Sequence, residues 1–219
     1  MNKKVVKISW PIFILQLCIV ASMLIVGFLL WDQLPEMMPS HWNINGEIDS
    51  YMDKTTWIWI FPGITMLMVL MFPFLSRIDP KKEKYELFRR PWLILQMVFV
   101  GFFAYIYFVS LYLTLNPSVP ITGFIFGGMG VMFVLIGNYL GKVRQNWFMG
   151  IRTPWTLDNE EVWNKTQRLA GWLFLTAGLV VFAEAFIQWQ VAWVMGVVIG
   201  IAVVVPVVYS YFLHRKLTK

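Results

Sequence analysis

The chain has 219 residues, of which 58% are hydrophobic and only 14% are charged. A soluble domain usually carries about 25% charged residues, so this composition excludes an ordinary soluble fold and indicates a lipid environment. The formal net charge of +6 does not indicate a nucleic-acid-binding protein, because the cations lie in short clusters between apolar runs, where a membrane surface would be. No direct contact with nucleic acid is therefore expected.

Six apolar runs are long enough to cross a bilayer, since a spanning helix needs about 20 apolar residues. They are Trp10–Trp31, Trp57–Leu75, Trp92–Leu115, Ile121–Gly141, Leu169–Gln188 and Val191–Leu213. The predicted fold class is all-α, a polytopic membrane protein with six transmembrane helices. Three substantial loops remain outside the predicted spans, at residues 32–56, 76–91 and 142–168.

The distribution of Lys and Arg predicts the orientation of these spans. Lys54 is the one cation on the side of the first loop, and the other side carries Lys3, Lys4, Lys7, Arg77, Lys81, Lys82, Lys84, Arg89, Arg90, Lys142, Arg144, Arg152, Lys165, Arg168, Arg215, Lys216 and Lys219. Cations of short loops stay in the cytoplasm, so we expect a multi-pass protein of a bacterial cell membrane with both ends inside. The outer loop instead carries the acids Asp32, Glu36, Glu47, Asp49 and Asp53.

Glycines in two predicted spans indicate close helix packing. The fourth span contains Gly123, Gly127, Gly137 and Gly141, whose four-residue spacing lets helix backbones approach each other. The pair Gly196 and Gly200 in the sixth span has the same spacing, and we expect it to pack in the same way.

Glu184 is the one ionisable residue well inside a predicted span. Charged groups within a bilayer are costly and often mark functional sites. Glu184 also lies close to the outer end of its span, where a protonated or hydrogen-bonded carboxyl is tolerated. Both a functional and a purely structural role remain open.

The outer loop, residues 32–56, combines turn-forming residues with potential metal ligands. His41, Glu47, Asp49 and Asp53 are side-chain types that bind metal ions, but their spacing matches no known zinc signature. We therefore predict a compact loop over the outer face, and no metal site.

The third loop, residues 142–168, is unusually apolar and aromatic between its cations. We expect it to fold back against the helices or lie in the membrane interface. Asp158 and Glu161 have the spacing of a capping box, which predicts a helix from about Asp158 into the fifth span. Pro154 is predicted to end any helix that arrives from the fourth span. The planar donors of Arg152 should bind carbonyls at the ends of neighbouring spans, or lipid phosphate.

This loop carries a long motif. The residues from Asn146 to Leu157, followed by Glu161-Val162-Trp163, resemble the signature of the SdpI-like family, with the core Gly150-x-Arg152-Thr153-Pro154-Trp155-Thr156-Leu157. The outer loop resembles the DUF1648 module that precedes this signature in longer members, through Leu34-Pro35, Pro39, His41, Gly46 and Asp49. The resemblance divides the chain into a DUF1648-like module at residues 1–91, which holds the first two spans, and an SdpI-like region at residues 92–219, which holds the other four.

The resemblance implies a function. Members of the SdpI-like family are membrane immunity proteins of spore-forming bacteria, which protect the producing cell against a secreted peptide toxin that damages membranes. They also act as receptors that hold a cytoplasmic ArsR-type repressor at the membrane. By this resemblance, the outer loop is the candidate toxin-facing site, with His41, Glu47, Asp49 and Asp53. The inner loop is the candidate partner-binding site, with Asn146, Gly150, Arg152, Thr153, Pro154, Trp155 and Trp163.

Two other functions remain open. A small solute transporter or channel could use Glu184 and the glycine-rich fourth span to line a path. A membrane enzyme could use the outer acids, but the sequence has no Ser/His/Asp set, phosphate loop or cofactor motif. We therefore expect a non-enzymatic protein without a cofactor.

Overall fold

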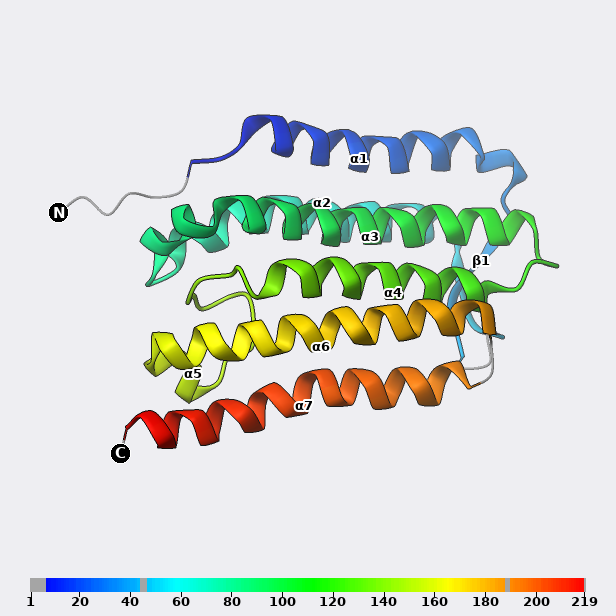
Figure 1. The fold of residues 1–219 in the computed structure, drawn as a ribbon. Helices are drawn as coiled ribbons and strands as arrows, with labels where there is room; N and C mark the ends of the chain where they lie inside the picture. Colours follow the sequence, from blue (N-terminus) through cyan, green and yellow to red (C-terminus); the bar gives the residue numbers. More distant parts are fainter. Residues whose placement is uncertain (1–6, 44–46, 188–189, 219) are drawn as a thin grey trace.

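The computed structural model describes residues 7–43, 47–187 and 190–218. Within these ranges six long helices run side by side (Figure 1), and each is long and apolar enough to cross a membrane. They are α1 (Trp10–Leu29), α2 (Lys54–Ile78), α3 (Arg89–Leu115), α4 (Ile121–Leu140), α6 (Glu160–Ile187) and α7 (Val191–Leu217). The predicted helical membrane protein with six spans is confirmed.

The helix ends differ from the predicted spans where polar residues continue an apolar helix. Helix α6 begins at Glu160 instead of Leu169, and α3 begins at Arg89 instead of Trp92. Backbone hydrogen bonding does not stop where the apolar segment stops, so a hydropathy pattern places such ends poorly. Gln188, the predicted end of the fifth span, lies outside the described residues.

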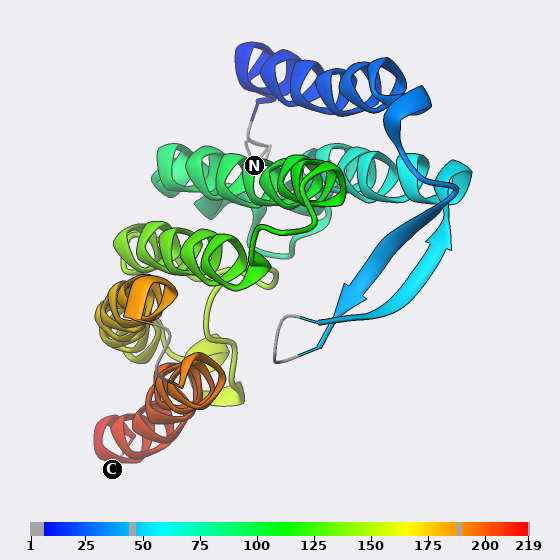
Figure 2. The same cartoon turned by 90° about the vertical axis from the view of Figure 1, so that its right-hand side faces the viewer.

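The helices form two groups that meet at α3 and α4. Helices α1, α2 and α3 pack against one another, whereas α4, α6 and α7 follow in a row in which α6 contacts both neighbours. Figure 2, which looks along the helices, shows α1 at one edge of the molecule and α7 at the opposite edge.

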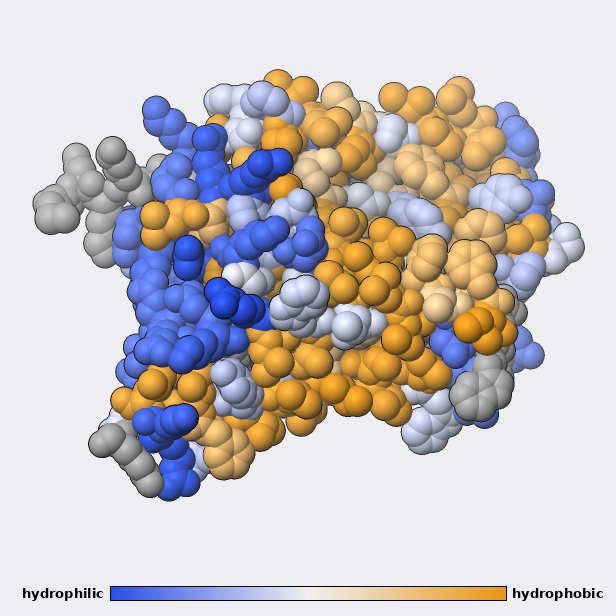
Figure 3. Space-filling view, in the orientation of Figure 1, coloured by the Kyte–Doolittle hydropathy of each residue, from blue (hydrophilic) through white to orange (hydrophobic). Residues whose placement is uncertain are grey.

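The two ends of the bundle differ in chemistry. One end carries the start of α1, the short helix η2 (Lys82–Phe88), α5 (Pro154–Asp158) and the end of α7 (Figure 1). We call it the cation-rich end, because it holds basic residues such as Arg77, Arg89, Arg144 and Arg215. Figure 3 shows hydrophilic residues gathered there, next to a wide apolar band. Both described ends of the chain thus lie on one side, and their cytoplasmic orientation stays a prediction.

The outer loop contains a β-hairpin, which the all-α class did not include. Strand β1 (Met37–Trp42) pairs antiparallel with β2 (Ile48–Asp53), with Met37 opposite Asp53 and Trp42 opposite Ile48. The short helix η1 (Trp31–Gln33) leads from α1 to this hairpin. We call this end of the bundle the hairpin end.

Two side chains of α2 hold the base of the hairpin. The indole Nε1 of Trp57 donates to the carbonyl of Pro39 at 2.8 Å, and Trp57 is fully buried. The ammonium of Lys54 lies 3.0 Å from the Glu36 carboxylate and also donates to the carbonyl of Leu34. The one cation of the outer loop is therefore buried under the hairpin.

Glycines bring α4 and α6 into backbone contact. A Cβ atom at Gly137 would lie 2.6 Å from the carbonyl oxygen of Gly171, and one at Gly130 would lie 2.8 Å from that of Gly178. Close packing of the fourth span is thus confirmed. The same expectation is wrong for Gly196 and Gly200, where an added Cβ would meet nothing within 4 Å, because these glycines do not lie against another helix.

Candidate functional site

The inner loop connects α4 to α6 at the cation-rich end, over residues 141–159, and Asn146 shapes its first turn. The Asn146 side chain is fully buried. Its Oδ1 accepts hydrogen bonds from the backbone N–H groups of Phe148 and Met149 at 2.8 and 2.7 Å. Its Nδ2 donates to the carbonyls of Arg144 and Met149. One side-chain amide therefore bonds two backbone N–H groups and two backbone carbonyls in a turn that has no regular secondary structure.

Gly150 is the residue at which the loop reverses against α6. Its φ angle is +109°, a region that side chains disfavour. The Gln167 side chain lies against it, so a Cβ atom at Gly150 would sit 2.8 Å from Gln167 Oε1. Gln167 accepts from the backbone N–H of Ile151 and donates to the carbonyl of Ile151, both at 2.9 Å. These two hydrogen bonds attach the backbone of the loop to α6.

Thr153 and Pro154 begin the short helix α5. Thr153 caps it, with its hydroxyl accepting from the backbone N–H of Thr156, and Pro154 occupies the first turn. The prediction that Pro154 ends a helix arriving from the fourth span was wrong, because α4 stops at Leu140 and Pro is well suited to a first helical turn. Thr153 Oγ1 also lies 3.1 Å from Ser210 Oγ on α7.

The cap of α6 is Asn159 rather than the predicted Asp158. Asn159 Oδ1 accepts from the backbone N–H groups of Glu161 and Val162 at 2.8 and 3.1 Å. Asp158 belongs to α5 and instead lies 2.8 Å from Nε2 of His214 on α7. The helix entering the fifth span exists as predicted, but it starts two residues later than the predicted cap, at Glu160.

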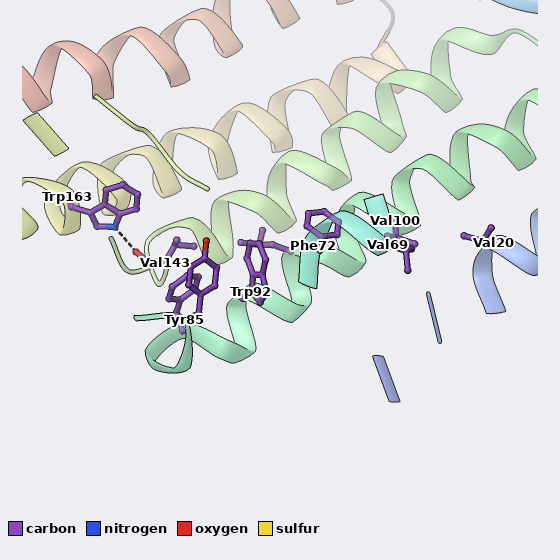
Figure 4. Close-up of a cluster of buried hydrophobic side chains, with 10 residues drawn as sticks. Val20, Val69, Phe72, Tyr85, Trp92, Val100, Val143 and Trp163 are labelled. Atoms are coloured by element: carbon purple, nitrogen blue, oxygen red, sulfur yellow. Dashed lines mark hydrogen bonds between the residues drawn. The ribbon is translucent and has the colours of Figure 1, made fainter. Parts of the chain in front are cut away.

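Arg152 and the two tryptophans of the motif occupy different environments. Arg152 is exposed, and its Nη1 donates to the carbonyl of Trp147 at 2.7 Å, within the loop itself and not at a neighbouring span. Trp155 is half-buried, with its ring 5.1 Å from that of Tyr211 on α7. Trp163 is fully buried and donates from Nε1 to the carbonyl of Val143 at 2.8 Å, beside the aromatic cluster of Tyr85 and Trp92 (Figure 4).

Asp79, at the end of α2, is a functional candidate that the sequence analysis did not identify. It is buried, and its carboxylate accepts three hydrogen bonds, from the backbone N–H groups of Lys81 and Trp147 and from the hydroxyl of Tyr85. Its signal in the sequence is weak, namely an acid next to Pro80 in a loop of cations. Asp79 joins the α2–α3 connection to the inner loop.

Further contacts strengthen this junction. Lys84 lies 2.7 Å from the carboxylate of Glu160, and Lys81 donates to the carbonyl of Leu157 at 3.0 Å. Burial lowers the pKa of the Lys81 ammonium, and the nearby Lys84 ammonium lowers it further. Gln145 donates to the carbonyls of Thr156 and Leu157, so the loop is bonded to α5 as well. The inner loop is thus hydrogen-bonded both to α5 and to the α2–α3 connection.

The hairpin brings two of the candidate outer residues, His41 and Asp49, together, whereas Glu47 and Asp53 have other partners. His41 Nδ1 lies 2.6 Å from Asp49 Oδ1, and Asn43 Nδ2 donates to Glu47 Oε2 at 2.8 Å. Asp53 caps α2, and hydrogen bonds from the side chain and backbone of Thr56 lower its pKa. Within the described parts of the chain, no three His, Cys, Asp or Glu side chains come close enough to hold a metal ion.

Comparison with known proteins gives matches in both regions. Residues 142–210 match the SdpI/YfhL protein family, and residues 18–66 match a domain of unknown function, DUF1648. The chain is also 27% identical over 205 residues to the Immunity protein SdpI of Bacillus subtilis (strain 168), across 93% of this chain and 96% of that protein. These matches confirm the resemblance of the inner loop to the SdpI-like family and of the outer loop to the DUF1648 module. No solved structure matches it.

The SdpI/YfhL match contains the inner loop, α5, α6 and most of α7. It starts at Lys142, directly after α4, and ends at Ser210, the residue that contacts Thr153. The DUF1648 match covers the hairpin and the adjoining parts of α1 and α2. Gly46, one of the residues of that resemblance, lies outside the described residues. The division of the chain at residue 91 stays a prediction.

Burial separates the SdpI/YfhL motif residues into two sets. Asn146, Thr153 and Trp163 are buried, so their contacts are internal to the protein. Arg152 and Pro154 are exposed. Glu184 lies on α6, far along the helix from this loop, and its side chain is 8% exposed.

Proposed function

We propose that this protein is a membrane immunity protein that protects the cell making it against a secreted peptide toxin. The observation that carries the proposal is the similarity to the Immunity protein SdpI of Bacillus subtilis, which extends over nearly the full length of both chains. A similarity of that extent includes both the hairpin and the inner loop. It therefore favours a common role over a shared membrane scaffold alone.

The hairpin supports this function as the toxin-facing surface. Its exposed apolar side chains are Met37, Ile48 and Tyr51, which are 54%, 40% and 53% exposed. The acids Glu47 and Asp49 lie on the same two strands or at their edge. A peptide that attacks membranes combines apolar and cationic side chains, and this surface offers a counterpart to both.

A cleft beside the hairpin gives such a peptide a place to bind. It has a volume of about 430 Å³ and lies between the hairpin and the α3–α4 connection, with Trp42, Tyr51 and Pro117 in its walls. In the proposed orientation this cleft faces outward, at the membrane surface where a secreted toxin arrives.

The inner loop supports a second, cytoplasmic role in signalling. We propose that its exposed side is where an ArsR-type repressor binds when toxin is present. Trp147 is 46% exposed, and its carbonyl holds the exposed Arg152 in place. An aromatic side chain beside a fixed guanidinium is a common composition of protein-binding surfaces. The ring of Trp155, by contrast, packs against Tyr211, so Trp155 helps to hold the loop on α7.

The test is a challenge of cells with secreted toxin. Deleting the gene from its host should make the cells sensitive to cell-free medium from the parent culture, and the intact gene should restore survival. The variant Glu47→Gln/Asp49→Asn/Asp53→Asn should restore survival less well, and the deficit should grow at low salt, because ions screen such attraction over about 10 Å at 0.1 M. Asn at position 53 still caps α2, so the variant removes charge and keeps the hairpin.

A matched control removes three exposed acids at the other end, in Glu83→Gln/Glu86→Gln/Glu161→Gln, and should protect like the parent. Equal survival with and without the gene would contradict immunity. Rapid solute flux through proteoliposomes would instead support the transporter alternative. The same strains test signalling, because toxin should raise transcription of the immunity gene only in cells that contain the protein.

A further inference from the structure

A deep groove runs between α3 and α4 at the depth of the membrane. Its volume is about 1520 Å³, and it follows α4 from Pro120 near the hairpin end to Tyr139 near the cation-rich end. The wall from α3 is apolar, with Ile94, Met97 and Val98. Because α3 and α4 are both membrane spans, a groove along them is reached from the acyl-chain region of the bilayer.

Basic side chains stand at one end of this groove. Arg89 and Arg90 form the first turn of α3, both are exposed, and both line the groove. Among the residues that the structure describes, neither guanidinium has a hydrogen bond or an ion pair, and Glu86 at the same rim pairs with neither. Two adjacent guanidinium groups present planar donors that match the oxygens of a phosphate.

Gly101 lies in an open stretch of the apolar part of the groove. A Cβ atom at Gly101, on the α3 wall, would meet nothing within 4 Å. Nearer the hairpin end, the Tyr105 hydroxyl donates to the carbonyl of Phe124 at 2.8 Å and so joins α3 to α4. The groove therefore has a basic end near one membrane surface and an apolar body beyond it.

We propose that this groove binds an anionic phospholipid of the leaflet at the cation-rich end. The phosphate lies on Arg89 and Arg90, and the acyl chains follow the apolar walls past Gly101. Basic pockets between spans at the cytoplasmic side are known to bind acidic lipid head groups. A phospholipid has its charge at one end and its apolar chains beyond it. The groove likewise has its basic residues at one end and its apolar walls beyond them. The proposal does not depend on the immunity function.

The first experiment measures lipid binding by native mass spectrometry of the full-length protein in micelles. The probes are palmitoyl-oleoyl phosphatidylglycerol, which is anionic, and the phosphatidylcholine with the same chains. The parent should retain phosphatidylglycerol preferentially. Arg89→Gln/Arg90→Gln should bind it about 25-fold more weakly, because each cation near an anionic head group contributes about a fivefold factor. The control Arg77→Gln/Lys82→Gln removes two cations at the same end outside the groove and should bind like the parent.

The second experiment blocks the groove. Gly101→Phe places a ring in the open space and should abolish retention of phosphatidylglycerol. Gly63→Phe, at an exposed α2 position where an added Cβ also meets nothing, should retain it. Equal retention of both lipids, or loss in neither groove variant, would show ordinary surrounding lipid and overturn the proposal. A parent dimer that dissociates in both groove variants, with lipid retention unchanged, would show that a second copy covers the groove and would also overturn it.

Discussion

Asp79 determines how the cation-rich end is arranged. Its buried carboxylate receives a backbone N–H from Lys81 on its own loop, a hydroxyl from Tyr85 on η2 and a backbone N–H from Trp147 on the inner loop. A carboxylate accepts hydrogen bonds on both of its oxygens, whereas an amide has one acceptor oxygen and an aliphatic side chain has none. One residue outside the SdpI/YfhL motif thus positions the motif.

Substitutions of Asp79 should therefore destabilise the protein in a graded way. Asp79→Ala should cost about 1–3 kcal/mol for each buried donor that finds no new acceptor, and Asp79→Asn should cost less because one oxygen remains. Tyr85→Phe removes a single donor and should cost about 1 kcal/mol. Thermal unfolding in detergent, followed by tryptophan fluorescence, measures the series. An Asp79→Ala protein that unfolds at the parent temperature would contradict this role.

At the scale of elements, the contact between α4 and α6 holds together the helix group of α4, α6 and α7. Gly130 and Gly137 on α4 meet Gly178 and Gly171 on α6 through backbone atoms. In lipid there is no hydrophobic force between spans, so close backbone packing supplies much of the attraction. Helix α6 in turn supports the inner loop through Gln167, so the position of the loop depends on this contact.

Adding one methyl group at this contact should be enough to disturb it. Gly137→Ala forces α4 and α6 apart, and overpacking of this kind costs about 1–3 kcal/mol. Gly200→Ala is the matched control in α7, where the added Cβ meets open space and should leave stability equal or slightly higher. Melting temperatures and the amount of protein in the membrane compare the two. Equal behaviour of both variants would show that the α4–α6 contact tolerates separation.

At the scale of the whole molecule, two helix groups share one cation-rich end. The start of α1 and the end of α7 both lie there, and the hairpin lies at the opposite end (Figure 1). The distribution of Lys and Arg predicts that the cation-rich end lies in the cytoplasm and that the hairpin faces outward. The proposed toxin-facing and partner-binding surfaces are then on opposite sides of the membrane, linked by α2, which starts directly after β2 and ends beside Asp79.

Labelling of single cysteines tests that orientation. The chain has one cysteine, so Cys18→Ala gives a background without thiols. In intact cells an impermeant maleimide should label Ser50→Cys on the hairpin, and it should label Thr218→Cys at the end of α7 only after the membrane is permeabilised. The reverse pattern would overturn the cytoplasmic placement of both ends.

The sequence by itself determined the six spans, the separation of cations from the hairpin end, and an apolar inner loop that either folds back on the bundle or lies in the membrane interface. These features follow from local composition and spacing, which decide whether a segment prefers lipid, water or their interface. The tertiary structure alone decided which residues meet, including Asp79 with Trp147, Thr153 with Ser210, and Asp158 with His214. Such pairs depend on how each helix is rotated and how closely it packs. Hydropathy is nearly uniform around a membrane helix, so it does not encode either quantity.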